Sequence, residues 1–479
     1  MYASRIRFAL LLGVVFCTFL LTRAASTSAV AADADGSGQR PNVLFIAVDD
    51  LNDWIGCLGG HPQSRTPNID RLAARGVLFE KSYCAAPACN PSRAALLTGI
   101  RPSTSGVYLN SQPWRPAMPD VVTLPQHFMQ NGYRVIGGGK IFHGGFNDDA
   151  SWQEYFKKAG DPKPKNLPAN GIPGTAHFDW GPVQVDDEQM DDHRVVSWAV
   201  EELGKKQDKP LFLACGIFRP HLPWYVPQKY FDQHPVGSVE LPKILESDLD
   251  DVPAAGVKMA RPDGDDRKVR ESDNHHRAVQ GYLASIAFAD MQVGRLLEAL
   301  DNGPLADNTI VILWGDHGWH LGEKHHWRKF ALWEEATHAP LMITAPGVTK
   351  PGGRSPRPVS FMDIYPTLAD LCGLPVGEHL EGASLRTLLE NPQAAWDQPA
   401  LCTHGRNNHS LRSERWRYIR YADGSEELYD EQADPMEWKN LADDPQYAAV
   451  KKEFAALLPK ENAPNAASND DKPKGRRKS

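Results

Sequence analysis

Four apolar segments of the chain end abruptly in polar or charged residues, and this pattern constrains the fold more than any other feature. The segments run from Asn42 to Val48, Tyr133 to Ile136, Leu211 to Phe218 and Thr309 to Trp314. Continuously apolar strands predict a sheet that is covered on both faces, as in α/β proteins. Helical patterns lie between these segments, at 68–75, 92–98, 124–130 and 279–300. Because sites in such sheets form beyond the carboxyl ends of the strands, the polar residues that follow the segments are candidates for one shared pocket.

The composition is that of an ordinary globular protein and excludes several classes. Of the 479 residues, 41% are hydrophobic and 23% are charged, which excludes collagen-like and low-complexity chains. Lys and Arg number 52 against 60 Asp and Glu, so the net charge is −8. Because neutralising phosphates requires clustered Lys and Arg in excess, we expect no nucleic-acid partner.

The N-terminus predicts export. Arg5 and Arg7 precede an almost unbroken apolar run over 8–21, and residues 29–31 (AVA) offer a cleavage site. This is the layout of a signal peptide, so we expect cleavage after residue 31. An uncleaved anchor is the alternative, but the apolar run is short for a membrane span. We expect a periplasmic or secreted protein (lysosomal in a eukaryote) with no membrane partner after cleavage.

The remaining regions of the chain differ in residue pattern and composition. Ser413–Tyr421 alternates aromatic and charged residues and is followed by a Gly-containing turn and Leu428–Asp430, which predicts an antiparallel hairpin. The Pro-, Gly- and charge-rich stretches 147–187 and 236–273 predict long surface insertions. Residues 461–479 are polar and end in a basic cluster, which predicts a disordered tail, with a basic docking patch as the alternative. The predicted regions are a signal peptide at 1–31, a catalytic α/β domain at 40–380, a small C-terminal α+β subdomain at 381–460 and a disordered basic tail at 461–479.

The segment Cys89–Gly99 (CNPSRAALLTG) is the most informative stretch. Pro91 favours the first turn of a helix, so we expect Cys89 just before a helix N-terminus, where the backbone N–H groups favour an anion. Arg93 adds a fixed positive charge one turn later. Together these features indicate a nucleophile that faces an anionic group, with a structural cysteine as the alternative. A Ser92 nucleophile is the second alternative, but no G-x-S-x-G elbow surrounds it.

Candidate metal ligands follow the first and the last of the four apolar segments. Asp49 and Asp50 follow the first segment, and Asp316 and His317 follow the last. Adjacent buried carboxylates are costly unless a cation compensates them, and oxygen ligands suit Ca²⁺ or Mg²⁺. A solvated turn or helix cap is the alternative for an isolated Asp pair, but the second pair favours a metal. A zinc site is the other alternative, although no zinc-binding spacing relates His317, His320, His325 and His326.

The nucleophile segment resembles the signature of the type I, formylglycine-dependent sulfatases, in which Cys-x-Pro-Ser-Arg is followed by Leu-Thr-Gly. The resemblance covers most of residues 40–445. It is greatest to iduronate-2-sulfatase-like members, through Arg101-Pro102, residues 107–110, Arg219-Pro220-His221 and residues 336–341. It implies an alkaline-phosphatase-like α/β fold, with a large mixed central sheet flanked by helices and a small C-terminal antiparallel-sheet subdomain.

The resemblance also implies the cofactors and the site. Cys89 would be converted to Cα-formylglycine by a formylglycine-generating maturation enzyme, and one Ca²⁺ would be bound. The implied metal ligands are Asp49, Asp50, Cys89 as formylglycine, Asp316 and His317. The implied catalytic residues are Cys89, Arg93, Lys140, His143, His221 and Lys329.

In the implied mechanism, one hydroxyl of the hydrated aldehyde attacks sulfur. Arg93, Lys140 and Lys329 would stabilise the developing charge, with Arg93 also steadying the formylglycine. His221, with or without Lys329, would protonate the departing alcohol, and His143 is the candidate base.

The expected function is hydrolysis of a sulfate ester, on a 2-O-sulfated uronic acid or a related sulfated saccharide. One alternative is a phosphonate or phosphate ester hydrolase of the same superfamily. Another is a catalytically inactive protein that binds sulfated glycans. A thiol oxidoreductase that uses Cys84 and Cys89 is the third, but it lacks a C-x-x-C motif.

Overall fold

The structure is a computed structural model that describes residues 40–157, 159–175 and 177–471. The predicted signal peptide at 1–31 and the last residues of the predicted tail, 472–479, lie outside the described residues. In the described part of the chain, no helix is both long enough and apolar enough to cross a membrane.

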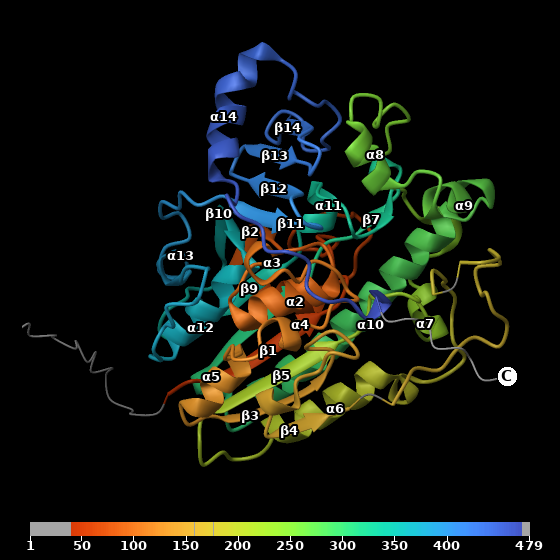
Figure 1. Cartoon of the computed structure of the whole chain (residues 1–479). Helices are drawn as coiled ribbons and strands as arrows, with labels where there is room; N and C mark the ends of the chain where they lie inside the picture. The colour runs from red at the N-terminus through yellow and green to blue at the C-terminus, as the bar shows by residue number, and fades with distance from the viewer. Residues whose placement is uncertain (1–39, 158, 176, 472–479) are drawn as a thin grey trace, which may run out of the picture. The chain divides into compact units, whose positions relative to one another are not determined.

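The centre of the fold is an eight-stranded sheet (Figure 1) in the order β10-β2-β9-β6-β1-β5-β3-β4. β1 runs parallel to its neighbours β5 and β6, whereas β9 runs antiparallel to both β2 and β6, so the sheet is mixed as expected. The four predicted strands correspond to β1, β3, β5 and β6. The strands are β1 (Asn42–Val48), β2 (Val77–Tyr83), β3 (Arg134–Gly139), β4 (Glu154–Phe156), β5 (Leu211–Ile217), β6 (Thr309–Gly315), β9 (Leu341–Thr344) and β10 (Gly353–Ser360).

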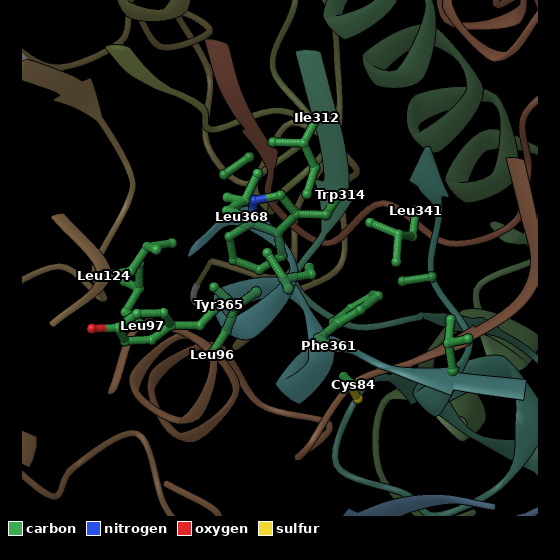
Figure 2. Close-up of a cluster of buried hydrophobic side chains, with 14 of the residues drawn as sticks. Cys84, Leu96, Leu97, Leu124, Ile312, Trp314, Leu341, Phe361, Tyr365 and Leu368 are labelled. Carbon is green, nitrogen blue, oxygen red and sulfur yellow. The ribbon is translucent and has the colours of Figure 1, made fainter. Parts of the chain in front are cut away.

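Helices cover both faces of this sheet, which explains why its central strands are apolar throughout. Alternate residues of β1 enter two different cores, Phe45 on one face and Ile46 on the other. The core around Phe45 includes α2, α5 and α12, and Figure 2 shows part of it, from Leu96 and Leu124 to Trp314 and Leu368. The core around Ile46 includes α1, α6 and α10. These helices are α1 (Pro67–Ala73), α2 (Cys89–Thr98), α5 (Leu124–Gln130), α6 (Asp191–Leu203), α10 (His275–Asp301) and α12 (Ile364–Leu371).

The predicted helices agree with the structure apart from their ends. α2 begins at Cys89 with Ala88 as its N-cap residue, so the cysteine is the first residue of the helix and not the residue before it. Shorter helices and a two-stranded ribbon complete this part of the chain. They are α3 (Pro102–Ser105), α4 (Trp114–Ala117), α7 (Gln228–Phe231), α8 (Ala254–Ala260), α9 (Asp265–Glu271), α11 (Glu334–Thr337), α13 (Arg386–Glu390), β7 (His320–Leu321) and β8 (Trp327–Arg328).

A separate four-stranded antiparallel sheet lies near the C-terminus, in the order β11-β12-β13-β14. The predicted hairpin is β13–β14, whose strands are joined by residues 421–425. The elements are β11 (Ala400–Thr403), β12 (His409–Arg412), β13 (Trp416–Arg420), β14 (Glu426–Asp430) and α14 (Ala448–Leu457).

Two expectations about irregular regions need correction. The stretch 147–187 is not only a surface insertion, because β4 extends the edge of the main sheet beside β3. The insertion at 236–273 contains α8 and α9. Residues 461–471 are not a disordered tail, because the backbone N–H groups of Ala463 and Ala466 donate to the carbonyl oxygens of Ser103 and Gly106. Cys402 lies next to Cys84, with 3.8 Å between the sulfurs.

Arg417 of β13 fixes the small sheet to the α/β part of the chain. Its guanidinium is fully buried, pairs with Glu334 of α11 and lies 3.2 Å from Glu431 Oε1. Burial alone would raise the pKa of Glu334, but Arg412 and Arg417 outweigh it and hold that pKa well below its usual range. The carboxylate therefore depends on its arginine partners to remain charged inside the protein.

We expect Arg417→Ala to lower the free energy of unfolding by about 3–5 kcal/mol, because it leaves buried carboxylates without their partner. Arg420→Ala is the matched control on the same strand, where the side chain is exposed, and it should change the stability by no more than about 0.5 kcal/mol. Urea unfolding of both variants measures the difference. Equal effects would show that Arg417 does not anchor the sheet.

Candidate active site and metal centre

The carboxyl ends of the central strands bring the two predicted acidic pairs together. Val48, the last residue of β1, is paired with Gly315, the last residue of β6, so Asp49-Asp50 and Asp316-His317 follow at the same edge. With Cys89 they form a buried cluster in which one ligand atom from each residue lies within 4.8 Å of the others. The sequence-predicted metal ligands therefore share one site.

The thiol of Cys89 lies between positive side chains at this site. Its Sγ is 3.0 Å from Lys329 Nζ, 3.6 Å from Lys140 Nζ and 3.4 Å from His317 Nε2. Burial alone would raise the pKa of the thiol, but Lys140 and Lys329 outweigh it and lower that pKa below its ordinary value. The environment therefore favours negative charge at residue 89.

The first acidic pair occupies two different electrostatic environments. Burial would raise the pKa of Asp49, but its contacts with Lys140 and Arg93 hold it well below the usual range. Burial raises the pKa of Asp50 to about 7, although Lys329 Nζ lies 2.5 Å from its Oδ1. Asp50 also has a left-handed backbone (φ 59°), which is rare outside glycine and is tolerated mainly at functional sites.

Arg93 organises the carboxylates of the site. Its Nη2 donates to Asp49 Oδ1 at 2.9 Å and its Nε donates to Asp316 Oδ2 at 2.8 Å. Its Nη1 donates to the backbone carbonyl oxygens of Lys140 and Ile141. The guanidinium thereby links the strand ends of β1, β3 and β6 from the first turns of α2.

His317 directs its Nε2 to the cluster. Its Nδ1 donates to the carbonyl oxygen of Gly318 at 3.0 Å, because a carbonyl only accepts. Its Nε2 lies 3.3 Å from Asp50 Oδ1 and 3.5 Å from Asp316 Oδ2, and although burial opposes protonation, Asp316 outweighs it and raises the pKa of the imidazole. A cation bound here would take the place of the Nε2 proton, and the hydrogen bond from Nδ1 to a carbonyl is one that fixes the ring of a metal-binding histidine.

His143, His221 and Lys140 all line one cavity, whose volume is about 450 Å³. Burial and the charge of Lys140 lower the pKa of His221 well below its usual value and that of His143 to about 4. Nδ1 of His221 is 2.5 Å from the carbonyl oxygen of Leu222, so its Nε2 faces the site, 3.9 Å from Asp50 Oδ2. In the described structure, Nδ1 of His143 is buried without a hydrogen-bond partner.

The arrangement of these residues agrees with the result of comparing the sequence with known families. A family model described as Sulfatase matches residues 41–374. The chain belongs to the sulfatase family. A second model, described as N-sulphoglucosamine sulphohydrolase, C-terminal, matches residues 322–463 of this sulfatase. It is a sulfuric ester hydrolase with the alkaline-phosphatase-like fold that the resemblance implied.

Individual relatives support the same assignment. The sulfatase is 40% identical over 445 residues to a protein named Sulfatase from Formosa agariphila, covering 88% of this chain and 87% of the relative. It is 32% identical to the iduronate 2-sulfatase of Mus musculus, covering 78% and 74%. The solved structure of a 2-O GAG sulfatase superimposes with a TM-score of 0.69 at 23% identity, covering 88% of this chain and 91% of that one, and shows the shared fold.

Several contacts of the sulfatase site were not predicted from sequence. Tyr282 of α10 donates its hydroxyl to the carbonyl oxygen of Asp50 at 2.8 Å, and Ser92 Oγ donates to that of Asp316 at 2.5 Å. Asn90 donates to the carbonyl oxygens of Leu109 and Gln112. Ser92 was visible as part of the signature, but a single tyrosine in an apolar helix gives no signal in sequence.

The donor set fits a hard divalent cation. Three carboxylates and the Nε2 lone pair of His317 converge with residue 89, and Asp50 Oδ2 is buried without a hydrogen-bond partner in the described structure. Oxygen-rich sets of this kind suit Ca²⁺ or Mg²⁺, and the thiol is the one soft donor. Conversion of Cys89 to formylglycine would replace that sulfur by oxygen.

Proposed function

We propose that this sulfatase hydrolyses the sulfate ester of a 2-O-sulfated uronic acid or a closely related saccharide, using Cα-formylglycine at position 89 and one bound Ca²⁺. The observation that carries the proposal is the position of Cys89, buried within a convergent acidic cluster and flanked by Lys140 and Lys329. The likeness to iduronate 2-sulfatase supports the choice of sugar.

The proposed cofactors supply the nucleophile and its activation. The hydrated aldehyde would provide a hydroxyl group for attack on sulfur, and a cation held by Asp49, Asp50, Asp316, His317 and residue 89 would polarise it. The two lysine ammonium groups lie where they can neutralise a sulfate group placed beside residue 89. Arg93 holds Asp49 and Asp316 in their ligand positions through its hydrogen bonds.

The histidines would handle protons. Because Nδ1 of His221 is committed to the Leu222 carbonyl, Nε2 is the atom that would hold and deliver a proton to the departing alcohol oxygen. Burial and Lys140 lower the pKa of His221, but the negative charge of a bound sulfate ester would favour the protonated ring that a general acid requires. His143 lines the same cavity as His221, and its lowered pKa favours the neutral ring that a base requires. Together they line one side of Lys140, where the departing alcohol would lie.

Maturation and location form part of the proposal. A formylglycine-generating enzyme would act on the Cys89–Arg93 signature, and residues 1–31 would direct export to the periplasm or the extracellular space. The protein would then meet sulfated saccharides outside the cytoplasm.

The proposal is tested by assaying the matured enzyme on 4-nitrophenyl sulfate, the matched 4-nitrophenyl phenylphosphonate and a set of sulfated disaccharides. We expect the sulfate ester to be preferred, and the 2-O-sulfated uronate disaccharide to be desulfated in preference to its 6-O-sulfated isomer. Preference for the phosphonate would favour the hydrolase alternative. Saccharide binding without turnover of any ester would favour the inactive glycan-binding alternative.

His221→Ala should distinguish leaving groups. We expect kcat/KM for the saccharide sulfate to fall by about 10²–10⁴-fold, because a sugar alkoxide needs a proton to depart. The value for 4-nitrophenyl sulfate should fall by less than about 10-fold, since nitrophenolate leaves without protonation. Equal losses on both substrates would exclude His221 as the general acid.

A further inference from the structure

A cavity of about 890 Å³ opens between the α8–α9 insertion, the β8 strand and the loops of the small C-terminal sheet. The proposed chemistry does not use it. Arg328 and Phe330 line it, while Lys329 between them points to Cys89. Both Arg328 (φ 80°) and Phe330 (φ 76°) have strained, left-handed backbones. This conformation lets Arg328 and Phe330 line the cavity while Lys329 contacts Cys89.

Two walls of this cavity are attached to the residues around the nucleophile. The N–H of Phe330 donates to the carbonyl oxygen of Pro87 at 3.0 Å. The carbonyl oxygen of Leu109, on another wall, accepts a hydrogen bond of 2.9 Å from the side chain of Asn90. Because Pro87 and Asn90 are close to Cys89 in the chain, the cavity is fixed directly beside the catalytic site.

The lining carries more positive than negative charge in a protein whose net charge is −8. Four cationic side chains and two carboxylates line it, namely Lys258, Arg261, Lys268 and Arg328 with Asp265 and Asp423.

One of the two carboxylates of the lining is already paired. Asp265 accepts from Arg328 Nε at 2.6 Å, and Lys268 Nζ donates to the Gly174 carbonyl oxygen at 3.4 Å. None of the ion pairs among the described residues involves Lys258, Arg261 or Lys268. Three cations beside the catalytic site are therefore available to an anionic ligand.

Apolar groups of the lining suit a saccharide. Phe330 is half-buried and its ring lies 5.9 Å from that of His404, while Leu109 is 41% exposed. Exposed large apolar side chains at the rim of a charged cavity are typical of binding sites. A sugar ring presents apolar C–H faces to such groups and directs its charged substituents to the cations.

We infer that this cavity is a second anion subsite, which holds a negatively charged saccharide unit adjacent to the sulfated one. The inference rests on the proposed function and makes the substrate an acidic oligosaccharide rather than an isolated sulfated sugar. Lys258, Arg261 and Lys268 would bind a carboxylate or sulfate of the neighbouring unit, and Phe330 would contact its ring.

Calorimetry with the full chain carrying Cys89→Ala tests the subsite without turnover. The probes are sulfated tetrasaccharides from heparin, chondroitin sulfate and ulvan, each compared with its sulfated monosaccharide. We expect at least one tetrasaccharide to bind more tightly than its monosaccharide, and Lys258→Ala/Arg261→Ala/Lys268→Ala to weaken that binding by at least about 10-fold. Raising the salt concentration should weaken it in the same direction.

The controls isolate the cavity from general charge. Lys350→Ala/Lys452→Ala removes two exposed cations outside the lining and should change the affinity by less than about 2-fold. Lys258→Glu, a single change at an exposed position, serves if the triple variant does not fold, and it should also weaken binding. Tetrasaccharides that bind no more tightly than monosaccharides, or equal losses in the control, would overturn the subsite. Hydrolysis of 4-methylumbelliferyl sulfate by the enzyme with Cys89 intact tests the proposed function separately.

Discussion

Cys89→Ala is expected to abolish sulfate ester hydrolysis, lowering kcat/KM by at least about 10⁴-fold. The side chain is fully buried, and its Sγ lies 3.0 Å from Lys329 Nζ and 3.4 Å from His317 Nε2. Ser92, the alternative nucleophile in the signature, cannot take its place, because its Oγ is committed to the Asp316 carbonyl. The loss should appear in kcat rather than in KM, because the variant lacks the reacting group but keeps the lysines that would hold the sulfate group.

Cys57→Ala is the matched control for this substitution. Cys57 is a free, partly buried cysteine outside the acidic cluster, and its backbone N–H donates to Asp70 Oδ1 at 2.7 Å. The Cys57→Ala enzyme should retain activity within about 2-fold of the unaltered enzyme. Thermal unfolding of both variants checks that the fold is preserved. Retention of activity by Cys89→Ala would remove the nucleophile from the proposal.

Peptide mass spectrometry adds a readout that is independent of activity. In enzyme from a host that performs the maturation, the peptide containing residue 89 should be lighter than the cysteine form by about 18 Da, as expected for conversion of CH₂SH to CHO. An active enzyme in which residue 89 remains a thiol would show that formylglycine is not required.

The sequence was sufficient to predict the strands that place the acidic pairs. β1 and β6 are continuously buried, so their apolar character was readable, and parallel neighbours necessarily end at one edge. Asp49, Asp50, Asp316 and His317 could therefore be assigned to one pocket before any coordinates were known. The signature at Cys89–Gly99 then supplied the nucleophile.

The contacts within the site were not predictable, because they join distant residues. The partners of Arg93 lie 44 residues away at Asp49 and 223 residues away at Asp316, and a single sequence records neither hydrogen bond. The resemblance placed Arg93 beside residue 89, and the geometry adds its hydrogen bonds to the two carboxylates. The order of residues 461–471 was hidden for a related reason, since a polar segment bound through backbone hydrogen bonds has no apolar pattern.

The electrostatics of the cluster explain why a cation should bind strongly. Asp49, Asp50 and Asp316 are buried together, and Asp50 has a raised pKa because burial and nearby negative charge oppose its ionisation. A divalent cation would compensate those charges and provide the partner that Asp50 Oδ2 lacks in the described structure. Any ligand that binds the folded state alone stabilises it, by about 2.7 kcal/mol at 100 times its Kd.

Asp50→Asn is therefore expected to lower Ca²⁺ affinity by at least about 100-fold, because it removes a charged ligand while keeping the shape of the side chain. Activity at limiting Ca²⁺ should fall in parallel. The measurement is calorimetric titration of protein stripped with EGTA, with Mg²⁺ titrated for comparison. Asp53→Asn, a neutralisation in the same loop but outside the cluster, should bind Ca²⁺ within about 3-fold of the unaltered protein. Stripped protein that is fully active and binds neither ion would contradict the metal centre, whereas tight binding of Mg²⁺ in preference to Ca²⁺ would retain the site and change the ion.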